Sequence, residues 1–450
     1  MTMAVIVVLV LLVAFMLFGV PVGFAIGGAT MAAMWLCSDL NMVVNAQYCY
    51  SGIFSFTVMA IPFFMLAGVI MSTGGIARRI VDFASALIGF VAGSLGCVTI
   101  LACMFFGALC GSGMATASAI GSMMIPEMKK KGYDVPYATT VVCFAAIVGP
   151  IIPPSLSFVL YGAATKTSVP DLFRAGILPG ILIGVLFILM NIFLCKRHGW
   201  DLRQKSVQAQ ADAEKVLTKE EQKALMRRAM KERLHMIWNT FKDGFWALLS
   251  PVIILGGIYS GIFTPTEAAC VSVVYSIFAS MFIYKEMGKR ELFQTFLAAS
   301  VLNGVTSFLL GYSTVFSTFM TFEQVPQMIS HFLTTVSNNP IIILLLINAI
   351  LLVIGLFLDT VPAIIVMAPL LLPTVQSLGI DPIQFGVIMS VNLAIGLCSP
   401  PYGCNLFVGA AVAKIKMESM LKWIVPYFVL AIIALMLITF VEPLSMFLVG

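Results

Sequence analysis

The sequence is poor in charge and in groups that could carry out acid–base or metal chemistry. Only 10% of its 450 residues are Asp, Glu, Lys or Arg, whereas soluble domains carry about a quarter. Its three histidines, His198, His235 and His331, are isolated from one another, and its ten cysteines form no CxxC pair. A P-loop of the GxxxxGK[ST] type is also missing. These absences give an enzyme little support and exclude ATP binding through that motif.

Apolar residues take the place of charge. They make up 60% of the chain, and the mean hydropathy is +1.05. Many apolar runs are long enough to cross a hydrocarbon core of roughly 30 Å, and they lack the two-residue alternation of barrel strands. We therefore expect an all-α polytopic protein in a lipid bilayer, with no nucleic-acid partner. The predicted spans lie near 2–18, 22–36, 53–72, 137–164, 173–195, 246–262, 266–284, 291–311 and 423–448.

Two further hydrophobic segments, 88–127 and 341–377, are too long for one crossing and are interrupted halfway. The first interruption has the sequence GALCGSG (107–113). The second runs from Gly355 through the Asp-Thr-Val-Pro segment at 359–362. Non-helical backbone at membrane depth is tolerated only inside protein or against a water-filled cavity. We therefore predict two re-entrant helical hairpins, each followed by a broken helix, at 137–164 and 382–413.

The two halves of the chain repeat at an offset of 247 residues. GPIIPPSLSFVLYGAA (149–164) aligns with GLCSPPYGCNLFVGAA (396–411), so both copies contain a Pro-Pro break. The hairpin interruptions have the same register, because Ser112 aligns with Asp359. Paired, interrupted hydrophobic helices in the two halves of a membrane protein indicate the binding site of a secondary transporter.

The charges around the repeats indicate opposite orientations. The loop after the first hairpin contains three lysines at 129–131, whereas the equivalent loop at 376–378 has no basic residue. Because cytoplasmic loops are enriched in Lys and Arg, the two loops are predicted on opposite sides of the membrane, as in an inverted repeat. We divide the chain into a first repeat (1–195), a cytoplasmic linker (196–243) and a second repeat (244–450).

The linker holds 12 of the 25 Lys and Arg residues. Its segment 214–238 is rich in helix formers and has a ragged apolar stripe. This pattern favours an amphipathic helix lying along the membrane surface. A solvated helical linker is the alternative.

The interruptions in the two hairpins and the two broken helices provide backbone groups that can bind ions. Opening a helix in the membrane frees carbonyl oxygens for a hard cation such as Na⁺, and it creates helix N-termini that favour an anion. A carboxylate in hydrocarbon is costly and suggests function, although Asp359 could also cap its own hairpin tip. For Glu267 we expect a structural role in the first turn of a helix, next to Thr264 or Thr266. The residues that we assign to an anionic substrate are Ser112, Gly113, Ser155, Ser157, Asp359, Thr360 and Asn405.

Five segments resemble the large membrane subunit of tripartite ATP-independent periplasmic (TRAP) transporters, and the resemblance extends over nearly the whole chain. The segment IILGGIYSGIFTPTEAA is the most specific of them. The segments are FGVP (18–21), IPFF (61–64), GPIIPPS (149–155), IILGGIYSGIFTPTEAA (253–269) and PPYGCNLF (400–407).

The resemblance implies an elevator-type symporter coupled to two Na⁺ ions. Its transport domain would hold both hairpins and both broken helices, and the remaining spans would form the scaffold. Each Na⁺ site would lie where a hairpin tip meets the neighbouring unwound segment. The first would use Gly107, Gly111, Ser112, Gly149, Pro150 and Pro153, and the second Gly355, Gly396, Ser399 and Tyr402.

The resemblance also implies two partners in a bacterial inner membrane system. One is a small four-helix membrane subunit, and the other is a periplasmic binding protein that delivers an anionic organic acid. That acid would be a C4-dicarboxylate, a sugar acid or a sulfonate, selected largely by the binding protein. The alternatives are a stand-alone Na⁺/dicarboxylate symporter or exchanger and, more remotely, a membrane-embedded enzyme.

Overall fold

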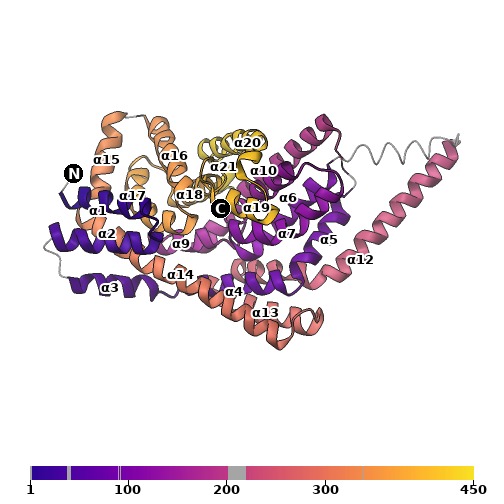
Figure 1. Cartoon of the computed structure of the whole chain (residues 1–450), viewed down its shortest axis with the longest axis horizontal. Helices are drawn as coiled ribbons and strands as arrows, with labels where there is room; N and C mark the ends of the chain where they lie inside the picture. Colours follow the sequence, from indigo (N-terminus) through magenta and orange to yellow (C-terminus); the bar gives the residue numbers. More distant parts are fainter. Residues whose placement is uncertain are drawn as a thin grey trace.

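The structure is a computed structural model that describes residues 3–37, 42–89, 91, 93–200, 219–337 and 339–449. Every regular element in these ranges is a helix, which confirms the predicted class (Figure 1). Seven of the helices are long and apolar enough to cross a membrane, and an eighth span results if one bent pair is counted as a single crossing.

The helices of the first half are α1 (Met3–Leu17), α2 (Val22–Cys37), α3 (Met42–Ile53), α4 (Ala60–Thr73), α5 (Ile76–Ile88), α6 (Ser94–Cys110), α7 (Gly113–Lys130), α8 (Val135–Ala146), α9 (Leu156–Thr165) and α10 (Val169–His198). Those of the second half are α12 (Lys219–Tyr259), α13 (Pro265–Phe278), η1 (Ala279–Ile283), α14 (Lys289–Phe322), α15 (Val325–Val336), α16 (Pro340–Phe357), α17 (Thr360–Ser377), α18 (Pro382–Gly396), α19 (Cys404–Ala413), η2 (Met417–Met420), α20 (Leu421–Phe440) and α21 (Pro443–Met446).

The 247-residue register is visible in the helix boundaries. The bounds of α7, shifted by 247, are those of α17, and α6, α8 and α9 correspond within a few residues to α16, α18 and α19. The turns agree as well, because Gly132 and Gly379 have φ angles of 81° and 80°. Both Pro-Pro peptide bonds are cis. Local signals such as glycine turns and N-terminal prolines thus define the same unit twice.

The two copies pack by exchanging contacts at the centre of the molecule (Figure 1). Helix α7 of the first copy packs on α19 of the second, and α17 of the second packs on α9 of the first. Within each copy, α6 packs on α8 and α16 on α18. As a result the parts of the broken helices that lead into the breaks are enclosed, and every residue of 137–151 and 384–399 is buried.

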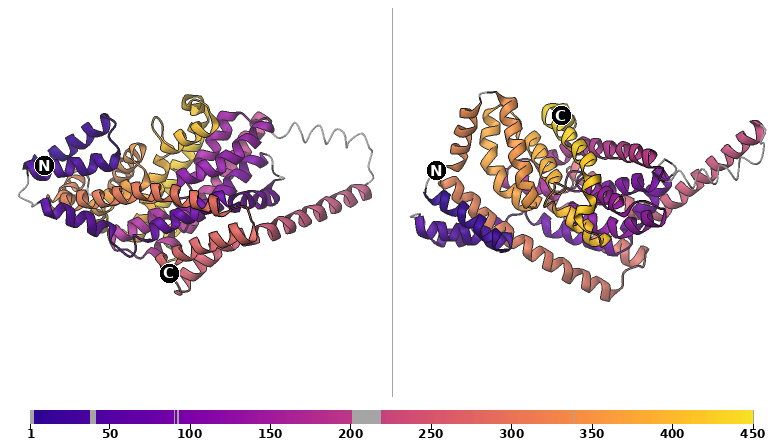
Figure 2. Two further views of the ribbon diagram at one scale, coloured as in Figure 1. Left: turned by 60° about the horizontal axis from the view of Figure 1, so that its bottom comes forward. Right: turned by 45° about the horizontal axis from the view of Figure 1, so that its top comes forward.

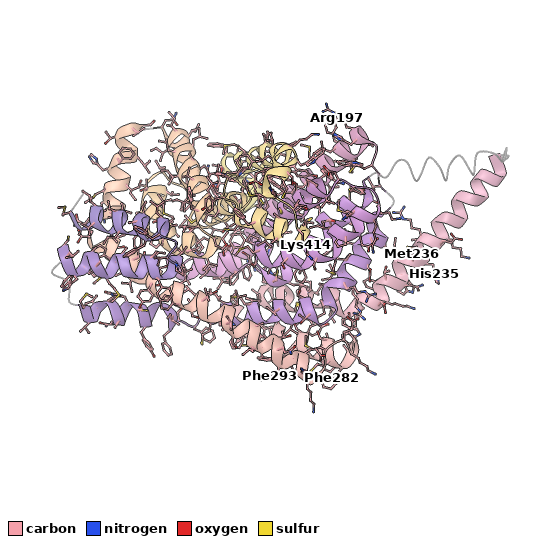
Figure 3. The ribbon with its side chains drawn as sticks, in the orientation of Figure 1. Arg197, His235, Met236, Phe282, Phe293 and Lys414 are labelled. Carbon is pink, nitrogen blue, oxygen red and sulfur yellow. The ribbon has the colours of Figure 1, made fainter. Side chains whose placement is uncertain are left out.

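Long helices surround this centre. Helix α4 packs on α13, α5 on α12, and α2 and α3 on α14. Large apolar side chains face outward here, such as Phe282 of η1 and Phe293 of α14, which are 64% and 70% exposed and lie at the edge of the molecule in Figure 3. Such a surface suits a lipid environment, where apolar exposure has no penalty.

The prediction of one span over 53–72 is wrong. Helix α3 ends at Ile53, and α4 begins only at Ala60. After α4 the chain bends by 67° into α5, which the sequence analysis did not anticipate. Gly75 makes the bend possible with a φ of 81°. Helix α5 was not predicted, because its charged residues interrupt the hydrophobic pattern. Helix α15 was not predicted either, and α14 extends past the predicted end at 311.

The predicted boundary between linker and second repeat lies inside one continuous helix. Helix α12 passes through positions 243 and 244 without a break and projects from the body of the molecule in both views of Figure 2. Its candidate span begins at Lys231, and Leu234, Met236 and Trp238 on it are more than half exposed. The segment 201–218, which includes the start of the predicted linker helix, lies outside the described residues.

We expect Gly396→Ala to destabilise the fold strongly. A Cβ atom on Gly396 would lie 2.6 Å from the Cα atom of Gly355, so α16 and α18 would have to separate, and overpacking of this kind costs about 1–3 kcal/mol. The control is Gly256→Ala, where nothing lies within 4 Å and the helix should gain slightly. Thermal unfolding in detergent measures both changes, and equal melting temperatures for the two variants would contradict the close crossing.

Candidate functional site

The first break joins a hairpin tip to a Pro-Pro segment. Gly111 connects α6 to α7 with a φ of 63°, and a Cβ atom on it would lie 2.9 Å from the main-chain nitrogen of Leu156 and 3.1 Å from the carbonyl oxygen of Pro154. The tip therefore lies directly against the break between α8 and α9. Only a residue without a side chain fits there.

One helical turn before Gly111, a pair of glycines brings α6 against the segment that follows α8. A Cβ atom on Gly107 would lie 2.6 Å from the Cα atom of Gly149. Across the break, the Ser155 hydroxyl donates to the carbonyl oxygen of Pro150 at 2.5 Å and caps α9. The residues predicted for the first cation site thus do converge, although Gly107 lies inside α6 rather than in the interruption itself.

Several neutral oxygens surround Gly149. The position of a Cβ atom on Gly149 would be 3.1 Å from Thr116 Oγ1 and 3.2 Å from the carbonyl oxygens of Ala146 and Ser112. Thr116 also donates to the Ser112 carbonyl at 2.7 Å. Carbonyl and hydroxyl oxygens are the ligands that a hard cation prefers. Thr116 was not predicted from the sequence, although its spacing of four residues from Ser112 places the two residues on the same face of the helix.

The second break repeats the glycine crossing. Gly355 of α16 and Gly396 of α18 are in contact through their backbones, and the Ser399 hydroxyl donates to the carbonyl oxygen of Ile395 at 3.4 Å. The Tyr402 side chain is 58% exposed, and its ring lies 5.8 Å from that of Phe357. The Tyr402 ring therefore lies at the surface beside Phe357.

Asp359 caps the second hairpin tip. Its Oδ1 atom accepts hydrogen bonds from the main-chain nitrogen of Thr360 at 2.7 Å and from the Thr360 hydroxyl at 3.3 Å. This is the internal capping that the sequence left open as an alternative. Ser112 has the equivalent position at the first tip and accepts a hydrogen bond from the Ala115 nitrogen at 3.4 Å.

The residues assigned to the substrate divide between the two breaks. Asp359 and Thr360 lie at the second tip, whereas Ser112, Gly113 and Ser155 lie at the first. Ser157 is buried on α9, and its hydroxyl has no hydrogen-bond partner.

Asn405 was predicted to serve the break of its own, second copy, but its side chain lies at the first hairpin tip. A Cβ atom on Gly113 would be 3.1 Å from Asn405 Nδ2.

Apart from Asp359 at the second tip, we find no charged side chain that the contacts described above bring to either break. Among the described residues, no three His, Cys, Asp or Glu side chains come close enough to hold a metal ion. Glu267 has the structural role expected for it, because it forms a capping box with Thr264 at the start of α13. The breaks therefore offer neutral oxygens and backbone N–H groups.

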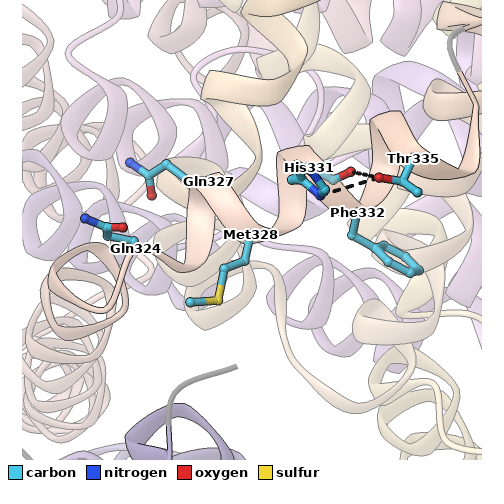
Figure 4. A pocket seen from close by; sticks show the side chains of 6 residues that line it. All are labelled: Gln324, Gln327, Met328, His331, Phe332 and Thr335. Atoms are coloured by element: carbon cyan, nitrogen blue, oxygen red, sulfur yellow. Dashed lines mark hydrogen bonds between the residues drawn. The ribbon is translucent and has the colours of Figure 1, made fainter.

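A surface hollow on α15 is unrelated to the breaks (Figure 4). Its lining comes from one stretch of chain and includes Thr335, which donates to the carbonyl oxygen of His331 at 2.7 Å. None of its lining residues was predicted as part of a site. They are Gln324, Gln327, Met328, His331, Phe332 and Thr335.

Comparison with solved structures gives the fold. The YdaH transporter of Alcanivorax borkumensis matches with a TM-score of 0.60 at 13% identity, covering 98% of this chain and 100% of that one. MtrF of Neisseria gonorrhoeae matches with a TM-score of 0.57 at 13% identity, covering 88% and 83%. At this identity the likeness concerns the fold alone.

Comparison with sequences gives the family. The isethionate TRAP transporter permease DctMQ of Oleidesulfovibrio alaskensis is 37% identical over 97% of this chain, which spans 65% of its length. The C4-dicarboxylate permease DctM of Pseudomonas aeruginosa is 39% identical, over 87% of this chain and 86% of that relative. The sialic acid permease SiaM of Vibrio cholerae is 34% identical, over 93% of this chain and 92% of that relative. The profile of the tripartite ATP-independent periplasmic transporter DctM component matches residues 9–444. The chain therefore belongs to the family of TRAP transporter large permease subunits.

Proposed function

We propose that this chain is the translocation subunit of a Na⁺-coupled, binding-protein-dependent importer of an anionic organic acid. The observation that carries the proposal is the pair of breaks, in which each hairpin is in glycine-to-glycine contact with a broken helix. Each break combines free backbone groups with hydroxyl and carbonyl oxygens, and neither has a cluster of acidic side chains. This donor set suits a monovalent cation bound together with an anion.

The residues present fit a cation at the first break. Ser112 and Ala146 would offer carbonyl oxygens and Thr116 a hydroxyl. At the second break Gly355, Gly396 and Ser399 would hold the second ion. A bound Na⁺ would supply positive charge beside the substrate, so that the acid enters the membrane centre partly neutralised.

The substrate would use the helix N-termini at the two tips. Backbone N–H groups at the start of α7 favour an anion, and Ser112 adds a hydroxyl group. At the start of α17 the N–H and hydroxyl of Thr360 already donate to Asp359, so the substrate would have to displace the Asp359 carboxylate to use them. The relatives are named for C4-dicarboxylate, isethionate and sialic acid transport, which supports an organic acid as the transported class.

Family membership supports two partners in the bacterial inner membrane system. One is a small membrane subunit, and the other is a periplasmic protein that binds the acid and delivers it. The isethionate relative DctMQ is the longer protein, and this chain spans 65% of its length.

Transport would occur by an elevator movement. The exchange of contacts between α7 and α19 and between α17 and α9 makes the hairpins and broken helices one unit, which could move as a whole. Re-entrant hairpins would let both tips meet near the middle of the membrane. The peripheral helices α2, α4, α13 and α14 would provide the static scaffold.

Reconstitution in liposomes tests whether transport requires the binding protein and Na⁺. In liposomes that contain this chain and the small subunit, we expect uptake of the acid only when the binding protein is added outside and a Na⁺ gradient points inward. A K⁺ gradient of the same size is the control. Uptake without the binding protein would instead indicate the stand-alone symporter, and covalent conversion of the acid would indicate an enzyme.

Thr116→Val should weaken Na⁺ at the first site. The change keeps the shape of the side chain and removes one oxygen, so we expect the Na⁺ concentration for half-maximal uptake to rise about tenfold, the equivalent of about 1.4 kcal/mol. Thr306→Val is the matched control, because Thr306 makes the same bond to the carbonyl four residues earlier but lies half-buried on α14. Equal Na⁺ dependence in the two variants would remove Thr116 from the site.

Ser399→Ala probes the second site in the same way. We expect a similar rise in the Na⁺ requirement, since Ser399 follows Gly396 by three residues and its hydroxyl bonds to the carbonyl oxygen of Ile395, directly before Gly396. The control is Ser419→Ala on the surface, where the hydroxyl bonds only to its own turn. A Na⁺ titration of uptake that matches the wild type would show that Ser399 is not a ligand.

A further inference from the structure

Asn405 belongs to the second copy by sequence and backbone. It is the second residue of α19, directly after the second Pro-Pro break. Its main-chain nitrogen donates to the carbonyl oxygen of Leu397 at 3.0 Å, which closes the loop of that break. Its position is therefore fixed by the geometry of the second site.

The side chain of Asn405 reaches the first site. A Cβ atom on Gly113 would lie 3.4 Å from Asn405 Oδ1 and 3.3 Å from the carbonyl oxygen of Ala146. That same Ala146 oxygen is one of the three that surround Gly149, with Thr116 Oγ1 and the Ser112 carbonyl. The Asn405 amide thus borders the space enclosed by the oxygens of the first site.

The Asn405 oxygen has no hydrogen-bond partner. The residue is fully buried, and its Nδ2 atom donates to the carbonyl oxygen of Cys143 at 3.5 Å, which directs Oδ1 away from that contact. An unsatisfied buried acceptor costs about 1–3 kcal/mol, so such an oxygen is expected to meet a ligand.

The contact is specific to one half of the molecule. The position equivalent to Asn405 in the first copy is Phe158, which is apolar and buried. The amide is therefore not a feature that the repeat imposes on both breaks.

We infer that Asn405 Oδ1 is a Na⁺ ligand of the first site that is supplied by the second repeat. This inference rests on the proposed Na⁺ coupling and extends it. Because the same residue closes the second break, an ion at the first site stabilises the closed form of the second, and by linkage the second ion tightens the first. The two ions then bind cooperatively.

The test measures Na⁺ binding without transport. The purified chain, in complex with its small subunit, is unfolded thermally in increasing NaCl, with choline chloride holding the ionic strength constant. A ligand that binds only the folded protein raises its stability. For the wild type we expect stabilisation by Na⁺ with a Hill coefficient above about 1, as cooperative sites require.

Asn405→Leu removes the oxygen and keeps the volume. We expect the half-stabilising Na⁺ concentration to rise at least about tenfold and the Hill coefficient to fall to about 1. Asn405→Asp keeps an oxygen in place and should retain the Na⁺ response. The matched control is Asn45→Leu, because Asn45 is equally polar and buried but lies on α3.

Two outcomes would overturn the inference separately. If the wild type responds to Na⁺ and Asn405→Leu responds identically, the oxygen binds only water, and the proposed function stands. If Na⁺ does not stabilise the wild type, the proposed coupling is lost together with the inference.

Gly113→Ala gives an independent measurement if Asn405→Leu does not fold. Its methyl group would enter the space beside Asn405 Oδ1 and should reduce the Na⁺ response to the same extent, whereas Gly256→Ala should leave it unchanged. An unchanged response in Gly113→Ala would also contradict the inference.

Discussion

The structure depends on one constraint, which is that backbone opened between two apolar helices must be covered by protein. Each Pro-Pro break leaves carbonyl and N–H groups without helical partners, and the residues that lead into it are buried. The hairpin tips provide the cover, and glycines at Gly107, Gly111, Gly355 and Gly396 allow backbone to approach backbone. Without this coverage the same groups would be a severe cost rather than a binding site.

Features with local causes could be predicted from the sequence. The repeat offset located four pairs of helices, because the glycine turns, N-terminal prolines and caps that begin and end them lie within a few residues of each boundary. The capping of α13 by Thr264 and Glu267 was predicted for the same reason. The pairing of Gly107 with Gly149 was implied by the resemblance to TRAP transporter large subunits, and the two residues do lie against each other.

What the sequence did not provide depends on tertiary contacts. Asn405 was placed with its own copy, because nothing in its neighbourhood along the chain indicates that its side chain crosses to Gly113. The bend between α4 and α5 and the continuation of α12 were missed because charged residues at these places resemble loops or linkers in a hydropathy pattern. A hydrophobic pattern records which residues avoid water, and it does not record which helix they meet.

The exchange of α7 and α17 between the two copies has a consequence for the independence of each copy. Neither copy covers its own broken helix completely, because α9 is packed by α17 and α19 by α7. A single copy on its own would leave these surfaces of α9 and α19 uncovered. Each half therefore needs the other to complete its break, even where the two sequences differ, as at the pair Phe158 and Asn405.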